Sequence, residues 1–236
     1  MPMKIGLLKC DFVPQEFRNI NGGIPDMVHS LLNEAGAGAE LRVYRVWEGE
    51  LPGGIDECDG WLMSGSRASV FEDHEWIRNL ETFVHALHGG KRKIVGVCFG
   101  HQLIAQALDG ETKRADVGWG IGVQTVTLHD SRPWMQPPLD SCQLLFTHQD
   151  QVTRLPVGAE LLGSTAHCPN AMFTIGDHIL AMQAHPEYSR PYLRALIESR
   201  ESIIDPDIYR SGLASLDQDY HRKEIADWLK NFLLES

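Results

Sequence analysis

The sequence has few of the features expected of a secreted or membrane-spanning protein. Its five cysteines are odd in number and include no C-x-x-C pair, which argues against a disulfide framework. No apolar run reaches the length of a membrane span, and Met1-Pro2-Met3-Lys4 leads into an expected strand instead of a signal peptide. We therefore expect a reducing cytoplasm and no membrane partner. Four cysteines are expected to be reduced packing residues: Cys10, Cys58, Cys142 and Cys168.

A basic surface for nucleic acid is also missing. The formal net charge is −11, whereas nucleic-acid binders use clustered cations to neutralise phosphates. The single short basic cluster, Lys91-Arg92-Lys93, reads as a solvated turn before a strand. Repeats and low-complexity segments are absent, and 236 residues that are 43% hydrophobic suffice for one buried core. We expect one domain over residues 1–236, with residues 190–236 as a C-terminal extension.

Strands and helices alternate in the first half of the chain, which is typical of a parallel sheet between helices. Expected strands are 4–8, 41–46, 60–63 and 93–97, and expected helices are 22–34, 76–87 and 102–108. After Gly110 the pattern becomes short strands at 122–128, 143–146, 159–163, 171–175 and 179–183. Gly176-Asp177 indicates a hairpin between the last two. The expected fold is α/β: an open, mostly parallel sheet flanked by helices on both faces, with an antiparallel excursion.

The segment 190–236 predicts an amphipathic helical layer. Apolar residues recur at helical spacing in Tyr192-Leu193-Ala195-Leu196-Ile197 and in Ile225-Trp228-Leu229-Phe232-Leu233. Such stripes usually pack on the protein's own core, and this is the favoured interpretation. A surface for a partner protein is the alternative.

The most informative segment runs from Ile94 to Gln102, where an apolar strand ends in Gly96-Val97-Cys98-Phe99-Gly100. This pattern is typical of a nucleophile elbow, a sharp strand-to-helix turn that exposes a reactive side chain at a helix N-terminus. The flanking glycines allow backbone segments to approach closely. A thiolate at Cys98 is a strong nucleophile, and the N–H of Phe99 would point at a developing oxyanion. A buried structural cysteine is the alternative.

A base for this cysteine is available downstream, where the strand 179–183 runs into His185-Pro186-Glu187. Two residues apart on an extended chain, His185 and Glu187 have side chains on the same side. The carboxylate can accept a hydrogen bond from one imidazole nitrogen and leave the other for the thiol. The inferred catalytic triad is Cys98, His185 and Glu187.

With these motifs the chain resembles the class I, or triad, glutamine amidotransferases, the glutaminase domains found in GMP synthase and related synthases. The resemblance rests on Gly96–Gln102, on Gln183–Glu187, and on Asp59-Gly60-Trp61-Leu62-Met63-Ser64-Gly65-Ser66, which lie in family order. It implies a flavodoxin-like fold and a second oxyanion-hole N–H from Gly65 or Ser66, beside that of Phe99. It calls for neither a metal nor an organic cofactor.

Within that family the chain resembles free-standing GMP-synthase-like amidotransferases, a group that includes γ-glutamyl peptide hydrolases. Thr147-His148-Gln149-Asp150-Gln151-Val152 and the Gly65-Ser66-Arg67 turn support this resemblance. It implies acyl transfer from a γ-glutamyl donor through a Cys98 thioester, with glutamine or a γ-glutamyl compound as the small-molecule partner.

Three residues are candidates for binding the donor. Gln102 matches the family residue that contacts the amino-acid end of the substrate. Arg67 stands where many relatives have a glycine-proline turn, so it could pair with a substrate carboxylate, although a surface salt bridge is favoured. His148 could line the pocket or be a structural histidine that holds its loop.

Three functional interpretations stay open. The first is a self-contained γ-glutamyl hydrolase or transferase. The second is an ammonia-supplying glutaminase whose synthase partner is a separate chain, as in GMP-synthase-like systems. The third, less favoured, is a non-catalytic binding or redox-sensing module, which would need the thiolate but neither His185 nor Glu187.

Overall fold

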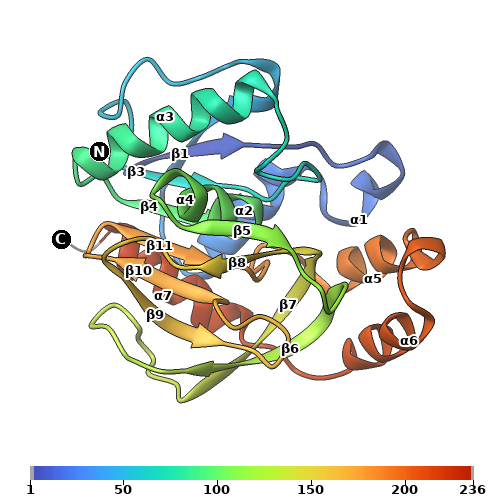
Figure 1. Ribbon diagram of the computed structural model, residues 1–236. Helices are drawn as coiled ribbons and strands as arrows, with labels where there is room; N and C mark the ends of the chain where they lie inside the picture. Colours follow the sequence, from blue (N-terminus) through green and yellow to red (C-terminus); the bar gives the residue numbers. More distant parts are fainter. Residues whose placement is uncertain (1–2, 235–236) are drawn as a thin grey trace.

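The computed structural model describes residues 3–234, and its centre is a nine-stranded sheet (Figure 1). The strand order is β2-β1-β3-β4-β11-β10-β9-β6-β7. Neighbouring strands pair in parallel from one edge to the middle, through β2 (Glu40–Arg45), β1 (Lys4–Lys9), β3 (Gly60–Met63), β4 (Ile94–Val97) and β11 (Ile179–Met182). The carboxyl ends of these strands therefore meet at one edge, which is where open α/β sheets bind ligands.

The other half of the sheet is antiparallel, as the sequence predicts. Its strands are β10 (Met172–Ile175), β9 (Ala159–Ser164), β6 (Gly120–Leu128) and β7 (Ser141–His148). The expected hairpin is confirmed, because Ile175 pairs with Ile179 across a turn in which Gly176 has a φ of 52°. A second sheet that the sequence analysis did not predict joins β5 (Glu111–Arg114) to β8 (Asp150–Arg154).

Helices cover both faces of the parallel half, because alternate side chains of each buried strand point to opposite faces. On one face Leu7 packs with α2 (Ile24–Glu34) and α7 (Arg222–Leu234). On the other, Leu8 packs with α3 (Glu75–Gly89) and α4 (Phe99–Ala107). The predicted α/β class, with helices on both faces and an antiparallel excursion, is confirmed.

The C-terminal extension packs on the core, in agreement with the favoured interpretation of its apolar stripes. In α7, Trp228 and Phe232 are fully buried against the sheet. The helices α5 (Arg190–Glu198) and α6 (Pro206–Ser215) pack on β6 and β7 through a separate cluster that includes Leu193 and Leu145. Figure 1 shows α5 lying beside α1 (Arg18–Asn21), at the end of the molecule to which the parallel strands point.

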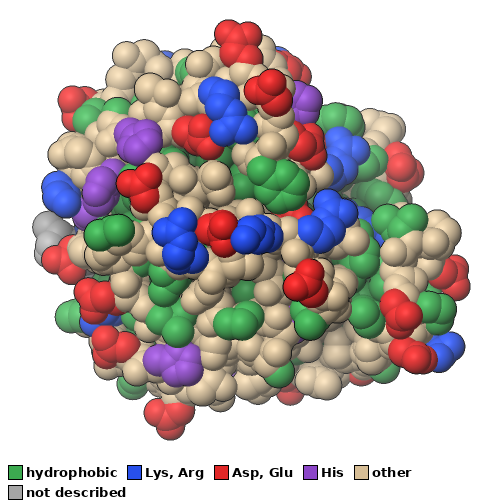
Figure 2. All heavy atoms as spheres, in the orientation of Figure 1, with side chains coloured by type: hydrophobic (Ala, Val, Ile, Leu, Met, Phe, Trp, Pro, Cys, Tyr) green, Lys and Arg blue, Asp and Glu red, His purple; other side chains and the backbone are tan. Residues whose placement is uncertain are grey.

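The surface carries mixed charge. On the face in Figure 2, Lys and Arg side chains are interspersed with Asp and Glu instead of forming one basic patch. All five cysteines are buried and unpaired. No helix within residues 3–234 is long and apolar enough to cross a membrane.

Candidate active site

The turn between β4 and α4 is a nucleophile elbow with Cys98 at its apex. Cys98 has a φ of 52° and a ψ of −102° and directly precedes the first residue of α4. The flanking glycines are required by close packing. A Cβ on Gly96 would lie 2.7 Å from the carbonyl oxygen of Gly100, and a Cβ on Gly100 would lie 2.6 Å from that of Met63. Neither glycine has a positive φ; within this turn the residue with a positive φ is Cys98.

Cys98 is only 6% exposed. Its backbone N–H donates to the carbonyl of Met182 over 2.9 Å, which ties the elbow to β11. The side-chain amide of Gln183 donates to Cys98 Sγ over 3.4 Å. Cys98 also precedes the N-terminus of α4 directly, and both a hydrogen-bond donor and a helix N-terminus favour a negatively charged sulfur.

The structure brings His185 and Glu187 to this cysteine. Met182 on β11 pairs with Val97 on β4, so the residues that follow both strands meet at one sheet edge. His185 Nδ1 donates to Glu187 Oε1 over 2.8 Å, and both side chains are buried. Burial lowers the pKa of His185, but the charges of Cys98 and Glu187 outweigh it and raise this pKa to about 10.

An aromatic ring that the sequence analysis did not single out fixes the plane of this imidazole. Tyr188 stacks on His185 with ring centroids 4.1 Å apart and an interplanar angle of 6°. Tyr192 packs edge-on against Tyr188 at 4.7 Å. The sequence analysis interpreted Tyr192 as a packing residue and did not consider Tyr188, because only their three-dimensional position places them beside His185.

The Gly65-Ser66 turn follows β3 and lies against the same cysteine. A Cβ on Gly65 would lie 2.8 Å from His185 Cε1 and 3.6 Å from Cys98 Cβ. The backbone N–H groups of Gly65 and Ser66 have no hydrogen-bond acceptor in the described part of the chain. Phe99, as the first residue of α4, has an N–H without an intrahelical acceptor. These free donors belong to two turns that adjoin Cys98, and the oxyanion-hole role of Phe99 and of Gly65 or Ser66 stays a prediction.

Two cavities meet at Cys98. The first, of about 240 Å³, we call the α5-side cavity; it contains His185 and four aromatic side chains, Phe12, Phe17, Tyr188 and Tyr192. The second, of about 220 Å³, we call the β8-side cavity; its polar lining includes Gln102, Arg114, His148 and Asp150. The walls common to both cavities are Ser66, Arg67, Cys98, Thr147 and Arg200.

The three candidate donor-binding residues differ in how many of their polar atoms already have hydrogen-bond or ion-pair partners within the protein. Gln102 donates to the carbonyl of Asp150 over 2.7 Å and to Gln183 Oε1 over 3.1 Å. Its own Oε1 has no partner within residues 3–234. Arg67 forms a bidentate pair with Asp11 over 2.9 and 2.8 Å, in agreement with the favoured salt bridge.

His148 is buried in the wall of the β8-side cavity, and burial lowers its pKa well below the usual value. Its ring contacts His167 edge-on at 5.5 Å. Its Nδ1 has no hydrogen-bond partner in the described part of the chain. His148 thus lines the pocket, and its contact with the side-chain amide of Gln151 over 3.4 Å also holds it within its own loop.

Arg200 is a further site residue that the sequence analysis missed, because an isolated arginine after a helix carries no motif. Its Nη1 donates to Thr147 Oγ1 over 2.6 Å, and its guanidinium lies 5.1 Å from the centre of the Trp119 ring.

Among the described residues, no group of three or more His, Cys, Asp or Glu side chains is placed to hold a metal ion.

Known proteins share this sequence pattern and this fold. The family described as "Glutamine amidotransferase class-I" matches residues 25–197. Gamma-glutamyl peptidase 3 of Arabidopsis thaliana is 33% identical over 202 residues, which are 81% of this chain and 79% of that protein. A glutamine-hydrolyzing GMP synthase of Streptococcus pneumoniae is 29% identical over 88% of this chain but only 36% of its own length.

Among solved structures, a glutamine amidotransferase from Thermotoga maritima superposes with a TM-score of 0.77 over 100% of both chains at 16% identity. At that identity the likeness concerns the fold, and the family match over residues 25–197 carries the assignment. The chain belongs to the class I glutamine amidotransferase family.

Proposed function

We propose that this enzyme hydrolyses or transfers the γ-glutamyl group of a small donor through a thioester on Cys98, with His185 as general base and acid and Glu187 orienting it. One observation carries the proposal: a buried imidazole, hydrogen-bonded to a carboxylate over 2.8 Å, lies against a cysteine at a helix N-terminus where two cavities meet. A thiolate, a base and free N–H donors are the parts that acyl transfer needs.

The reaction balances with these groups alone. Cys98 Sγ attacks the γ-carbonyl carbon, and the negative oxygen is stabilised by the N–H groups of Phe99 and of Gly65 or Ser66. The C–N bond then breaks, and the proton that His185 took from the thiol goes to the leaving nitrogen. Water then attacks the thioester carbon while His185 takes its proton, the C–S bond breaks, glutamate departs, and the proton on His185 returns to Sγ.

The β8-side cavity is suited to the glutamyl end of the donor. The free Oε1 of Gln102 can accept a hydrogen bond from an α-ammonium group, and His148 and Asp150 line the same space. Arg67 borders the same space, but its guanidinium is paired with Asp11 and offers the donor no uncompensated charge. The relationship to Arabidopsis proteins named gamma-glutamyl peptidases supports a γ-glutamyl compound as donor.

The test measures glutamate release by the purified chain from glutamine and from a panel of γ-glutamyl dipeptides. Cys98→Ala is the blank, and Cys168→Ala is the matched control because Cys168 is also buried and unpaired. Turnover of a γ-glutamyl compound that is lost in Cys98→Ala and retained in Cys168→Ala is expected. Turnover that survives in Cys98→Ala would place the nucleophile elsewhere.

A second candidate function is the ammonia-supplying subunit of a two-chain synthase. It is favoured by the match to GMP synthase, because the chain corresponds to about a third of that protein's length. Weak release from glutamine that rises on addition of a synthase chain would support this alternative. The absence of release from every donor would instead support a non-catalytic cysteine module.

We infer a reducing compartment such as the cytoplasm. All five thiols are buried and unpaired, and the catalytic proposal requires Cys98 to stay reduced.

A further inference from the structure

The position of His185 indicates which of the two cavities receives the leaving group of the donor. A general acid must lie within hydrogen-bond reach of the atom that it protonates. If Cys98 forms a thioester, as the proposed function requires, that atom is the leaving nitrogen of the donor. His185 lines the α5-side cavity and does not line the β8-side cavity. The leaving group therefore extends into the α5-side cavity, and the glutamyl end lies on the other side of Cys98.

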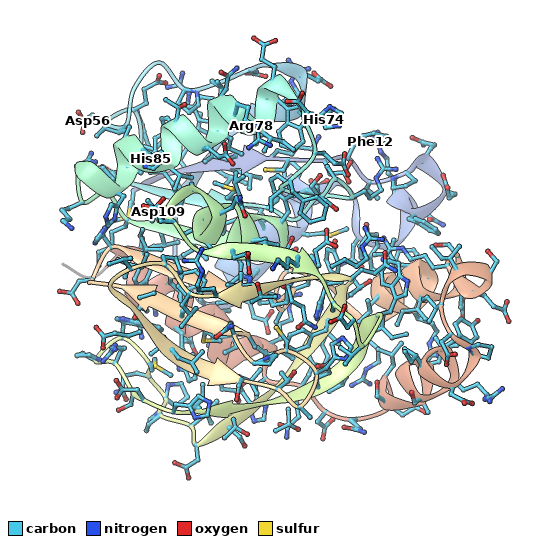
Figure 3. The ribbon with its side chains drawn as sticks, in the orientation of Figure 1. Phe12, Asp56, His74, Arg78, His85 and Asp109 are labelled. Atoms are coloured by element: carbon cyan, nitrogen blue, oxygen red, sulfur yellow. The ribbon has the colours of Figure 1, made fainter. Side chains whose placement is uncertain are left out.

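The α5-side cavity is much larger than ammonia requires, and its walls are aromatic. Tyr188 and Tyr192 meet edge to face, and Phe17 meets Tyr192 edge to face at 6.4 Å. Phe12 contributes from the loop after β1, which Figure 3 places near α1. Aromatic walls of this kind favour an apolar or aromatic side chain, because its burial removes apolar surface from water.

An unpaired guanidinium at this cavity favours a leaving group that carries a carboxylate. Of the two arginines that line both cavities, Arg67 is neutralised by its bidentate pair with Asp11. Arg200 has no carboxylate partner within residues 3–234, and its guanidinium hydrogen bond goes to a neutral hydroxyl, Thr147 Oγ1. A guanidinium has five N–H donors and pairs readily with a carboxylate.

Arg200 lies at the boundary of the two cavities, because its guanidinium contacts Trp119 of the β8-side cavity while the residue also lines the α5-side cavity together with Tyr188 and Tyr192. Burial raises the pKa of Tyr192 to about 12, and Arg200 opposes this rise. Burial likewise raises the pKa of Tyr188 well above its usual value, again opposed by Arg200. Glu16, the other acidic residue at this cavity besides Asp11, is exposed. In an intact γ-glutamyl amino acid the leaving portion carries only a carboxylate charge, so Arg200 complements it.

We propose that the α5-side cavity binds the leaving group and that Arg200 binds its carboxylate, which makes the preferred donor a γ-glutamyl derivative of an amino acid with a large apolar or aromatic side chain. This inference rests on the proposed function and adds the specificity of the same site. Arg200 follows α5 and lies outside the residues matched by the family, 25–197. The C-terminal extension thus supplies a substrate-binding residue in addition to packing.

Four donors separate the contributions of side chain and carboxylate: γ-Glu-Phe, γ-Glu-Gly, γ-glutamyl phenethylamide, which lacks the carboxylate, and glutamine, which lacks both. For the wild type, kcat/KM for γ-Glu-Phe should exceed that for γ-Glu-Gly by about 10- to 100-fold, as expected for burial of one phenyl group. Equal rates for γ-Glu-Phe and γ-Glu-Gly, or a preference for glutamine, would overturn the assignment of the cavity.

Arg200→Gln tests the carboxylate contact. It should lower kcat/KM for γ-Glu-Phe by about 10- to 100-fold, as for loss of a charged hydrogen bond, and change that for the phenethylamide by no more than about 3-fold. Equal losses on all four donors would overturn the role of Arg200. Each comparison is a ratio between donors on one preparation, so a change in the folded fraction cancels. Arg210→Gln, on the exposed face of α6, is the matched control.

Phe17→Ala tests the aromatic wall. It should reduce the preference for γ-Glu-Phe over γ-Glu-Gly by about 3- to 10-fold, as for loss of one aromatic contact. Phe71→Ala removes a half-exposed phenylalanine that lines neither cavity and should leave the preference unchanged. An unchanged preference in Phe17→Ala would contradict the proposal. If Cys98-dependent release is absent for every donor, the proposed function itself fails, and this outcome differs from release without preference.

Discussion

Arg222, the first residue of α7, donates a hydrogen bond of 3.1 Å from its Nη1 to the backbone carbonyl of Glu187. The same nitrogen donates to the carbonyls of Pro186 and Tyr188 over 3.2 and 2.9 Å. Its Nε donates to Glu34 at the end of α2 over 2.8 Å. The guanidinium therefore joins the loop that carries His185 to two helices on one face of the sheet, and α7 fixes the backbone of the candidate triad from behind.

Arg222→Met is expected to lower the free energy of unfolding by about 2–3 kcal/mol, because buried carbonyls lose their charged donor. Activity should fall through kcat more than through KM, since the loop orients His185 and does not bind the donor. Urea unfolding and steady-state kinetics measure the two effects. Arg194→Met, which loses an exposed pair with Asp217, is the control. A loss of stability with unchanged kcat per folded molecule would limit Arg222 to a structural role.

Replacement of Cys98 should separate stability from activity. A non-glycine residue at positive φ costs about 1–3 kcal/mol, and Cys98 has a φ of 52°. Cys98→Gly should therefore be more stable than Cys98→Ala by about 1 kcal/mol, and both should lack turnover. At Cys142, in β7, the order should be the reverse, because alanine is favoured over glycine in a strand. Urea unfolding of the four variants checks this, and an Ala variant that is more stable than Gly at position 98 would argue against strain at the elbow.

Glu187→Gln should change the pH profile as well as the rate. Burial lowers the pKa of His185, and Cys98 and Glu187 together raise it to about 10. Removal of the Glu187 charge lowers this pKa, so the imidazolium loses its proton at lower pH and the basic limb of kcat/KM moves to lower pH. By analogy with triad orienting groups, kcat should fall by about 10²- to 10⁴-fold. Glu81→Gln, on α3, is the control; a basic limb that stays in place would show that Glu187 does not set this pKa.

Much of the fold could be predicted because its signals are local. The apolar run 94–97 ends in glycines that only a tight strand-to-helix turn explains, and the structure has β4 and α4 there. The turn residues Gly176-Asp177 predict the hairpin, and the helical spacing of apolar residues predicts the packed helix α7. By contrast, β5 and β8 are short and polar, with exposed residues such as Lys113. The sequence of β5 lacks the alternation of apolar and polar residues that predicts a strand, and β5 is extended because it pairs with β8.

The site was predictable where residues carry chemistry in a recognisable order, and not where position alone gives them a role. Cys98, His185 and Glu187 stand at strand ends that the sheet order brings together. Tyr192 has the sequence appearance of a core residue, yet it lines a cavity beside the cysteine. Arg200 acquires its position from the packing of α5 on β7, a contact between residues far apart in the chain.

Buried neutral histidines should make the protein sensitive to acid. Burial lowers the pKa of His101 to about 3, and its ring donates from Nε2 to the carbonyl of Asn170 over 2.9 Å. Between pH 6.5 and 3 the unfolded chain binds a proton at this residue that the folded chain does not, so stability falls as the pH falls. Between pH 7 and 5 His101 should account for at most about 2 kcal/mol of lost stability. Urea unfolding of the wild type and of His101→Gln at both pH values measures the difference, and identical losses would contradict it.

Gly65→Ala should inactivate the enzyme without unfolding it. The added Cβ would lie 2.8 Å from His185 Cε1, and the ring cannot move aside freely because Tyr188 stacks on it and Glu187 holds Nδ1. A displacement of the imidazole by a fraction of an ångström to an ångström misaligns proton transfer, for which a loss of about 10²-fold in kcat is expected. Gly54→Ala is the matched control, since its Cβ would meet nothing within 4 Å. Measurement of kcat for both variants, with circular dichroism to confirm folding, decides the matter: full activity in Gly65→Ala would mean that His185 occupies another position during turnover.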